Sequence, residues 1–366
     1  MFYEKYLDAK EIQSRKERFG FPDARFIELL IYDYEIFRHL LKASDRFYLK
    51  GGAAAQLFTE LSQQRASKDI DLVTDHTPQE IDKIFAKIND VFPSKKHIPA
   101  KIVHDVPMVT YLVEVNSIVE DGEKLEIKAD ILIEDLKNYK LGKVPASEVF
   151  ALNTGIDLPV ISLGSLLADK FLTLAQKSIG IPHEKISEYP KQVYDLARIT
   201  KRIDRQEFSN MAYSFQRIMR SELKTRRLEN TSEEVILHIL DVLEQFAKLD
   251  EPVNAFKNYI NDFQSAYVSR EARKTTSGWI ADSLILMYLV KIFRRVIIKG
   301  EDESQVYAGW VSFIKELDGI RKLDIENRKK IREELIGKLR KAHPQWKKYK
   351  GSSEERIFLE LKHLVE

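Results

Sequence analysis

The chain of 366 residues contains no cysteine. It therefore has no disulfide framework and no thiolate metal site, which permits a reducing compartment, and we expect a cytoplasmic protein. The best membrane candidate, residues 279–298, carries an aspartate, a lysine and two arginines, and this composition predicts a buried helix with a charged end. The first five residues lack the basic and then apolar pattern of a secretory signal. We expect no membrane association.

Other signals of function are also missing. The eight histidines show no metal-ligand spacing, no Ser-His-Asp set is discernible, and we find no repeat and no low-complexity segment. With 44% hydrophobic and 32% charged residues, the composition is that of a globular protein. The length is sufficient for two domains, each with its own core.

Charge is distributed unevenly along the chain. Lys and Arg number 22 against 26 Asp and Glu in residues 1–150, but 37 against 31 in residues 151–366. The excess is concentrated in residues 198–227 (9 against 3) and 321–350 (12 against 4). Such segments can follow a nucleic-acid backbone by neutralising phosphates, although solvated helix faces have the same composition.

A glycine pair follows a short strand signal near residue 50. Apolar Phe47–Leu49 ends at Lys50, Gly51 and Gly52, and residues 53–61 have the composition and spacing of a helix. Adjacent glycines let a ligand approach the backbone closely, and a helix N-terminus offers unpaired N–H groups to a phosphate. An ordinary tight turn is the alternative.

Two aspartates follow seventeen residues after Gly52. Asp69 and Asp71 alternate with apolar residues, and the period of a strand places both carboxylates on one face. Two carboxylates that point the same way repel each other unless a cation lies between them. Magnesium uses such an oxygen pair together with substrate phosphates. A solvated edge strand would show the same pattern.

In combination these motifs suggest a family. Leu49-Lys50-Gly51-Gly52 followed by Ser67-Lys68-Asp69-Ile70-Asp71-Leu72 resembles the nucleotidyltransferase superfamily, and most closely its AbiEii/AbiGii toxin branch. The resemblance covers about residues 47–200. It implies a small mixed α/β sheet domain, a nucleoside triphosphate (NTP) substrate, Mg²⁺ or Mn²⁺ as cofactor, and a role as a toxin–antitoxin or phage-defence effector. Some members of the branch modify tRNA ends, so the resemblance also implies tRNA or another RNA as acceptor and a cognate antitoxin as partner.

A third acid is expected on a later strand. Residues 108–115 and 125–133 are rich in β-branched residues, and Glu120–Glu123 predicts a hairpin turn between them; residues 102–103 form a further strand signal. On the second strand of this hairpin, Asp130 matches the third metal acid of the family. Glu126 lies on the same face and is the competing candidate.

A lysine and an aspartate complete the implied site. Ser162 predicts the start of a helix that runs to about Ser178 and carries Lys170, and a second helix opens at Lys191 and carries Asp195. By resemblance, Lys170 contacts the triphosphate, together with Lys50, Gly51, Gly52 and Ser67, and Asp195 orients Lys170 or assists the acceptor. Without the family, Lys170 would be a solvated lysine and Asp195 would pair with Lys191.

The sequence departs from the family pattern at two positions. Ala53 stands where the branch usually has Thr or Ser, and Gln192 replaces the acid of a Lys-Asp pair. Neither change affects the metal acids Asp69, Asp71 and Asp130.

The remaining elements are predicted from periodicity and capping signals. Residues 7–19 and 23–41 predict helices, Thr77 opens a capping box for a helix to about Asn89, and residues 160–161 predict a short edge strand. Beyond Ile199 we predict helices only, at 205–228, 231–249, 253–269, 281–298, 303–317, 325–341 and 353–365. We therefore predict a fold of the α/β (α+β) class, with a catalytic domain at residues 1–160 and a basic, all-helical domain at residues 161–366.

The predicted activity is transfer of a nucleoside monophosphate (NMP) from an NTP to an acceptor hydroxyl, with release of pyrophosphate. Two alternatives remain. A nucleotidyltransferase of a small molecule such as an antibiotic would need an acidic pocket for a cationic acceptor. A non-catalytic nucleotide-binding interaction protein would lack a metal acid, whereas all three candidate acids are present.

Overall fold

The computed structural model describes residues 3–97 and 107–365. The chain forms two compact units. The first consists of residues 1–172, 190–229 and 258–273, and the second of residues 173–189, 230–257 and 274–366. The division into functional domains at residue 160 stays a prediction.

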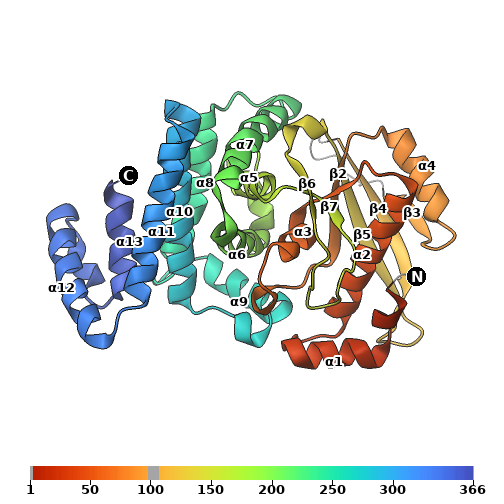
Figure 1. Ribbon diagram of the computed structural model, residues 1–366, viewed down its shortest axis with the longest axis horizontal. Coiled ribbons are helices and arrows are strands. Elements are labelled where there is room, and N and C mark those ends of the chain that lie inside the picture. Colours follow the sequence, from red (N-terminus) through yellow and green to blue (C-terminus); the bar gives the residue numbers. More distant parts are fainter. Residues whose placement is uncertain (1–2, 98–106, 366) are drawn as a thin grey trace. The chain divides into compact units, whose positions relative to one another are not determined.

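A seven-stranded mixed sheet forms the centre of the first unit (Figure 1). Its order is β3-β4-β5-β2-β1-β7-β6. The strands are β1 (Tyr48–Leu49), β2 (Asp69–Thr74), β3 (Ser94–His97), β4 (Met108–Asn116), β5 (Lys124–Ile133), β6 (Leu141–Val144) and β7 (Leu158–Ile161). The predicted mixed sheet is confirmed.

The strand that carries the paired aspartates lies inside the sheet. β2 pairs in parallel with β5 and antiparallel with β1, so it is not the solvated edge strand of the alternative interpretation. Its apolar residues Ile70 and Leu72 are fully buried, whereas Asp69 and Asp71 are half-buried on the other face. The predicted alternation is therefore confirmed.

The strand at residues 158–161 is not an edge strand, because β6 pairs with it on one side and β1 on the other. The edge strands β3 and β6 were not predicted, since SKKH and LGKV lack a run of β-branched residues. The predicted strand at residues 102–103 lies outside the described residues.

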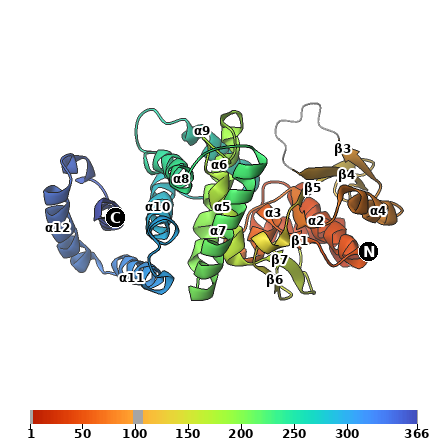
Figure 2. The ribbon, with the colours of Figure 1, turned by 90° about the horizontal axis from the view of Figure 1, so that it is seen from above.

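Two helices cover one side of this sheet. α2 (Arg25–Ala43) packs against β2 and β5 and against α4 (Pro78–Ile88), as Figures 1 and 2 show. Thr77 and Glu80 form the predicted capping box of α4. α1 (Ala9–Phe19) precedes α2 and ends at Gly20. The apolar stripes of α2 and α4 thus meet the buried face of the sheet.

The first unit contains further helices, of which α3 (Gly51–Leu57) comes early in the chain and the others come later. α3 begins at the glycine pair, two residues earlier than predicted, and is short because Gln64 Nε2 donates to the carbonyls of Gln56 (3.0 Å) and Thr59 (3.2 Å). The others are α5 (Leu163–Thr173), α6 (Tyr189–Ile199), α7 (Arg205–Thr225) and α9 (Phe256–Tyr267). α5 ends at Thr173, five residues before the predicted end at Ser178. The carbonyl of Thr173 accepts a hydrogen bond from the N–H of Ile181 (2.8 Å).

The second unit consists of helices in its described residues. They are α8 (Ser232–Ala247), α10 (Thr276–Lys299), α11 (Glu303–Arg321), α12 (Ile325–Ala342) and α13 (Glu354–Val365). α8 and α10 run side by side (Figure 2), and Phe246 and Trp279 meet between them. The predicted absence of strand beyond Ile199 is confirmed for the described residues, and so is the helical C-terminal region.

α10 contains the apolar stretch at residues 279–298. It begins at Thr276, five residues before the predicted start, because Thr275 accepts a hydrogen bond from the N–H of Gly278 (3.2 Å). No helix in the described part of the chain is long and apolar enough to cross a membrane.

Candidate active site

The turn into α3 brings the glycine pair against an aspartate of β2. Gly51 has φ +65°, a left-handed conformation that favours glycine. A Cβ on Gly51 would lie 1.9 Å from Asp71 Oδ2, so no other residue fits beside that carboxylate. The N–H of Gly52 points at the same oxygen, at 3.4 Å. The glycines therefore allow the start of α3 to approach Asp71.

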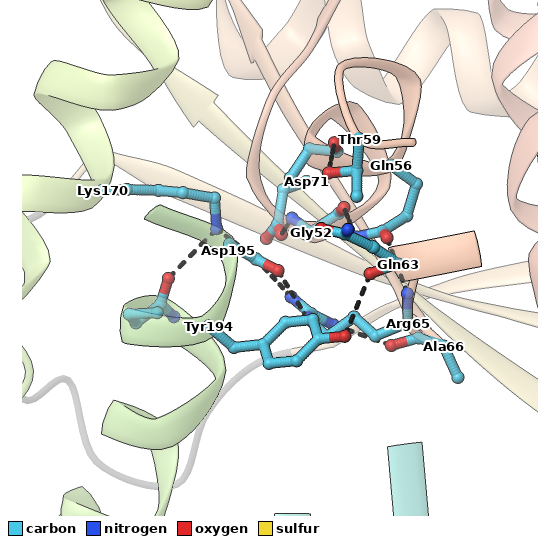
Figure 3. Close-up of polar contacts among 12 residues, drawn as sticks. Gly52, Gln56, Thr59, Gln63, Arg65, Ala66, Asp71, Lys170, Tyr194 and Asp195 are labelled. Carbon is cyan, nitrogen blue, oxygen red and sulfur yellow. Dashed lines mark hydrogen bonds and ion pairs between the residues drawn. The ribbon is translucent and has the colours of Figure 1, made fainter. Parts of the chain in front are cut away.

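Gly52 is constrained on its other side. A Cβ there would lie 2.7 Å from Ser67 Oγ and 3.1 Å from Arg65 Nη2. Gln56 links the same parts, because its amide donates to the Gly52 carbonyl (3.0 Å) and accepts from the N–H of Arg65 (2.9 Å). Figure 3 shows this packing. The start of α3 and the segment that leads into β2 thus form one rigid piece.

The two aspartates of β2 form a region of negative charge. Burial raises the pKa of Asp71, Asp130 adds to this effect, and Lys50 opposes it. Burial also raises the pKa of Asp69, against the opposing effect of Lys128. Raised pKa values at two half-buried neighbours indicate a site in which negative charge is poorly compensated by the chain itself.

Asp130 lies beside this pair in the sheet. Parallel pairing of β2 and β5 places it in register with Asp71. However, Asp130 Oδ1 accepts a hydrogen bond from Thr110 of β4 (2.6 Å), and Oδ2 forms an ion pair with Lys128. Within the described residues, no three His, Asp or Glu side chains converge as a metal site.

The competing candidate, Glu126, lies further along β5. It is in register with Glu114 of β4, and its carboxylate lies 3.4 Å from the exposed Lys95. It is four residues from the position that faces Asp71. The register therefore favours Asp130 over Glu126 as the neighbour of the aspartate pair.

Lys50 is held near the aspartates by a partner that we did not predict. Its Nζ lies 2.8 Å from Asp169 of α5, and both side chains are largely buried. Burial lowers the pKa of Lys50, but Asp169, together with Tyr139 and Asp71, outweighs burial and the net pKa is raised. Lys50 is therefore a fixed positive charge.

Lys170 and Asp195 meet in a buried cluster, which Figure 3 draws. Lys170 Nζ lies 2.7 Å from Asp195 Oδ2 and 3.1 Å from Gln192 Oε1. Arg65 binds the same carboxylate through two nitrogens, at 2.7 and 2.6 Å. The side chains of Arg65, Lys170 and Asp195 are 4%, 3% and 2% exposed, so neither a solvated Lys170 nor an Asp195 paired only with Lys191 describes the structure.

The cluster has more positive than negative charge. Burial raises the pKa of Asp195, but Arg65 and Lys170 outweigh it and hold the pKa below its usual range. Burial and the neighbouring Arg65 lower the pKa of Lys170, against the effect of Asp195. One carboxylate serves two cations here, because Asp195 accepts from both Arg65 and Lys170. Such a cluster favours an anion beside it.

Some residues of the site were missed by the sequence analysis. They are Arg65, Thr110, Lys128 and Asp169. Arg65 lies two residues before Ser67, inside the motif itself, but its partner Asp195 is 130 residues away. Thr110 meets Asp130 through the register of β4 and β5, and Lys128 lies beside Asp69 through the register of β5 and β2. The pair of Lys128 with Asp130, two residues apart on one face of β5, is local.

A model of the family described as "Nucleotidyl transferase AbiEii toxin, Type IV TA system" matches residues 36–274. The match contains every residue of the site described above. The protein is a nucleotidyltransferase. More specifically, the chain belongs to the AbiEii toxin family of type IV toxin–antitoxin systems.

The solved structures that match this chain include two that are described as nucleotidyltransferases. The toxin MenT4 of Mycobacterium tuberculosis matches at a TM-score of 0.42 and 13% identity, covering 78% of this chain and 98% of that one. A putative nucleotidyltransferase of H. pylori matches at 0.41 and 12%, covering 74% and 97%. A comparison with curated proteins gave no match.

Proposed function

We propose that this nucleotidyltransferase is divalent-metal-dependent and transfers an NMP from an NTP to a hydroxyl of RNA, with tRNA as the first acceptor to test. The observation that carries the proposal is the pair Asp69 and Asp71, which project from one interior strand beside the turn at Gly51 and Gly52. Family membership itself implies the NTP substrate and an antitoxin partner.

The residues present fit Mg²⁺ or Mn²⁺. Asp69 and Asp71 supply hard oxygen donors, burial disfavours their charges without a cation, and Asp130 is the neighbour of Asp71 in register. Asp69, Asp71 and Asp130 would hold the metal. A bound divalent cation neutralises phosphate charge and makes the acceptor hydroxyl more acidic.

The chain's own residues bind and orient the triphosphate. Gly51 and Gly52 allow close approach, and Lys50, Ser67 and Lys170 lie around the same turn or in the buried cluster behind it. In the reaction, the acceptor oxygen forms a bond to the α-phosphorus while the bond from that phosphorus to the β-phosphate oxygen breaks. Pyrophosphate leaves with the electron pair of that bond, and the hydroxyl proton passes to solvent.

Asp195 acts as a positioning residue in this proposal. Both of its oxygens accept hydrogen bonds from Arg65, and one also accepts from Lys170. A carboxylate held in this way is poorly suited to take a proton from an acceptor. Lys170 and Asp195 both lie beyond residue 160, which supports the proposal that residues 161–366 complete the active site.

RNA is favoured as acceptor by one face of α7. Tyr213, Arg217, Arg220 and Lys224 follow helical spacing, and the ring of Tyr213 lies between Lys140 Nζ (3.8 Å) and Arg217 Cζ (4.7 Å). Arg217, Arg220 and Lys224 are exposed. Exposed cations around an aromatic ring suit a phosphate backbone.

The second basic segment, around α12, is more self-compensated. Lys330 and Lys338 pair with Glu326 and Glu334, and Arg332 donates to backbone carbonyls. The ring of Trp346 is covered by Arg340 at 4.6 Å and Lys350 at 5.2 Å. We therefore place the RNA contact on α7.

A transfer assay tests the proposed reaction. The protein and its Asp71→Asn variant are each incubated with Mg²⁺, one of four α-labelled NTPs, and total bacterial tRNA. Label should enter RNA only with the unmutated protein. If NTP binds but no label enters RNA, the RNA acceptor is wrong and the acceptor is a small molecule or a protein. No NTP binding would overturn the assigned site.

The α7 face is tested by charge removal. Arg217→Gln combined with Arg220→Gln should weaken tRNA binding about tenfold at fixed salt, since two phosphate contacts are lost. NTP binding should not change. The matched control removes two exposed charges from α12, as Lys329→Gln with Lys341→Gln, and should have a smaller effect. An equal effect of the two pairs would contradict the assignment to α7.

A further inference from the structure

Lys128 lies at the carboxylate site and belongs to no motif. It is on β5, in register with Asp69 of β2, and its ammonium forms an ion pair with Asp130 Oδ2. Its side chain is 43% exposed, so it reaches the pair from the open face of the sheet. A lysine ammonium therefore lies where the proposed metal-binding carboxylates gather.

The two partners of Asp130 come from different strands. Thr110 of β4 donates to Oδ1, and Lys128 of β5 bonds Oδ2. Both oxygens of Asp130 therefore already have a partner within the chain. Asp130 is also in register with Asp71 on the neighbouring strand. A divalent cation that Asp130 shares with Asp69 and Asp71 would compete with the ammonium of Lys128 for the charge of this carboxylate. The ion pair with the flexible, half-exposed Lys128 is the one that can be exchanged for another cation.

We propose that Lys128 is a built-in competitor of the divalent cation, and that it must leave Asp130 before that carboxylate can join Asp69 and Asp71 as a ligand. The inference rests on the proposed metal dependence. It adds that the chain itself sets the metal affinity, because every binding event replaces the ammonium of Lys128. The displaced ammonium then lies at the edge of the site, free to contact a phosphate.

Metal binding without nucleotide tests this inference. Mn²⁺ is titrated into the full chain by calorimetry, with Lys128→Met as the test variant and Lys128→Gln as a second replacement. Both should bind Mn²⁺ about three- to tenfold more tightly than the unmutated protein, the effect expected for removing a half-exposed neighbouring cation. An affinity equal to or weaker than that of the unmutated protein would overturn the inference.

Two controls separate competition from a general charge effect. Lys96→Met removes a lysine of similar exposure, 39%, that pairs with Asp82 on the same unit, and should leave Mn²⁺ affinity unchanged. In an Asp130→Asn background, Lys128→Met should give no gain over Asp130→Asn alone, because the gain requires the freed carboxylate. A gain of the double variant over Asp130→Asn would show that Lys128 acts only through the overall charge, and would also overturn the inference.

The same titrations distinguish a failure of the competition by Lys128 from a failure of the proposed metal site. If Asp71→Asn binds Mn²⁺ as well as the unmutated protein does, or if no variant binds it, the metal site itself is wrong. If Asp71→Asn abolishes binding while Lys128→Met has no effect, only the competition is wrong. Circular dichroism and thermal unfolding of each variant check that the fold is retained.

Discussion

Asp69 and Asp71 are half-buried on one strand, whereas Asp195 is buried between Arg65 and Lys170, which come from two other segments. The first group has too little positive charge, and burial raises the pKa of both aspartates. In the second group two cations share one carboxylate, and the pKa of Asp195 is held low. The two charge clusters are therefore opposite in sign within a single unit.

This difference in charge indicates that the cluster around Asp195 supports the fold and that the pair Asp69 and Asp71 supports chemistry. A carboxylate with a raised pKa costs stability at neutral pH, and such costs are typical of functional sites. A buried carboxylate with two bonded cations cannot be removed without leaving charges unpaired. We expect mutation of the anionic cluster to affect activity first, and mutation of the cationic cluster to affect folding as well.

The largest effect on stability is expected for Asp195→Asn. Loss of the carboxylate removes the buried ion pairs that Arg65 and Lys170 make with it, and should lower the free energy of unfolding by about 3–5 kcal/mol. Urea unfolding followed by circular dichroism measures it. Glu126→Gln, which breaks the exposed pair with Lys95, is the control and should cost less than about 1 kcal/mol. Equal losses in the two variants would remove the contrast between the clusters.

Gly51→Ala should break the link between the turn and Asp71. Alanine at φ +65° costs about 1–2 kcal/mol by itself, and its Cβ would overlap Asp71 Oδ2. The matched control is Gly300→Ala, because Gly300 has φ +67° and no described atom lies within 4 Å of its Cβ position. Only Gly51→Ala should also abolish nucleotidyl transfer. Transfer at the unmutated rate would show that the approach of Gly51 to Asp71 has no catalytic role.

Asp33 of α2 is a further buried carboxylate whose charge interacts with Asp69 and Asp71. It is 1% exposed, and neither carboxylate oxygen has a hydrogen-bond partner among the described residues. Burial raises its pKa well above the usual value, and Asp69 and Asp71 add to the shift. The folded protein then binds this proton more tightly than the unfolded chain, so stability is lost as pH rises from about 4 toward the folded pKa.

Asp33→Asn should remove this pH dependence. The unmutated protein should lose stability relative to the variant by about 1.4 kcal/mol per pH unit across that window. Urea unfolding at pH 4.5, 5.5 and 6.5 gives the difference at each pH. A constant difference between the two proteins would mean that Asp33 ionises normally in the folded state.

The sequence predicted the anionic cluster better than the cationic one, for a physical reason. Asp69 and Asp71 are two residues apart, and strand periodicity alone places them on one face. Gly51 and Gly52 are recognisable because glycine has a local conformational role. Most helix positions followed in the same way from apolar spacing and caps such as Thr77.

The cationic cluster required tertiary information. Arg65 meets Asp195 across 130 residues, and Lys50 meets Asp169 across 119. The resemblance to a family predicted Lys170 and Asp195, but not Arg65, which donates to Asp195. Likewise, the involvement of Thr110 and Lys128 depends on strand register, which a single sequence does not specify for β4, β5 and β2 together.

The smallest effect on stability, and the one that sharpens the comparison most, is expected for Asp71→Asn. Because the pKa of Asp71 is raised in the folded protein, its charge costs stability above the unfolded pKa of about 3.9. The neutral variant should therefore be more stable at pH 7 by about 1 kcal/mol, and this gain should vanish below pH 4. Asn retains an oxygen that can accept from the N–H of Gly52, so the turn at α3 remains intact. Urea unfolding at pH 7 and pH 4, beside the transfer assay, would then record a protein that is more stable and inactive. Lower stability at pH 7 would mean that Asp71 supports the fold as Asp195 does, and the two clusters would no longer differ in kind.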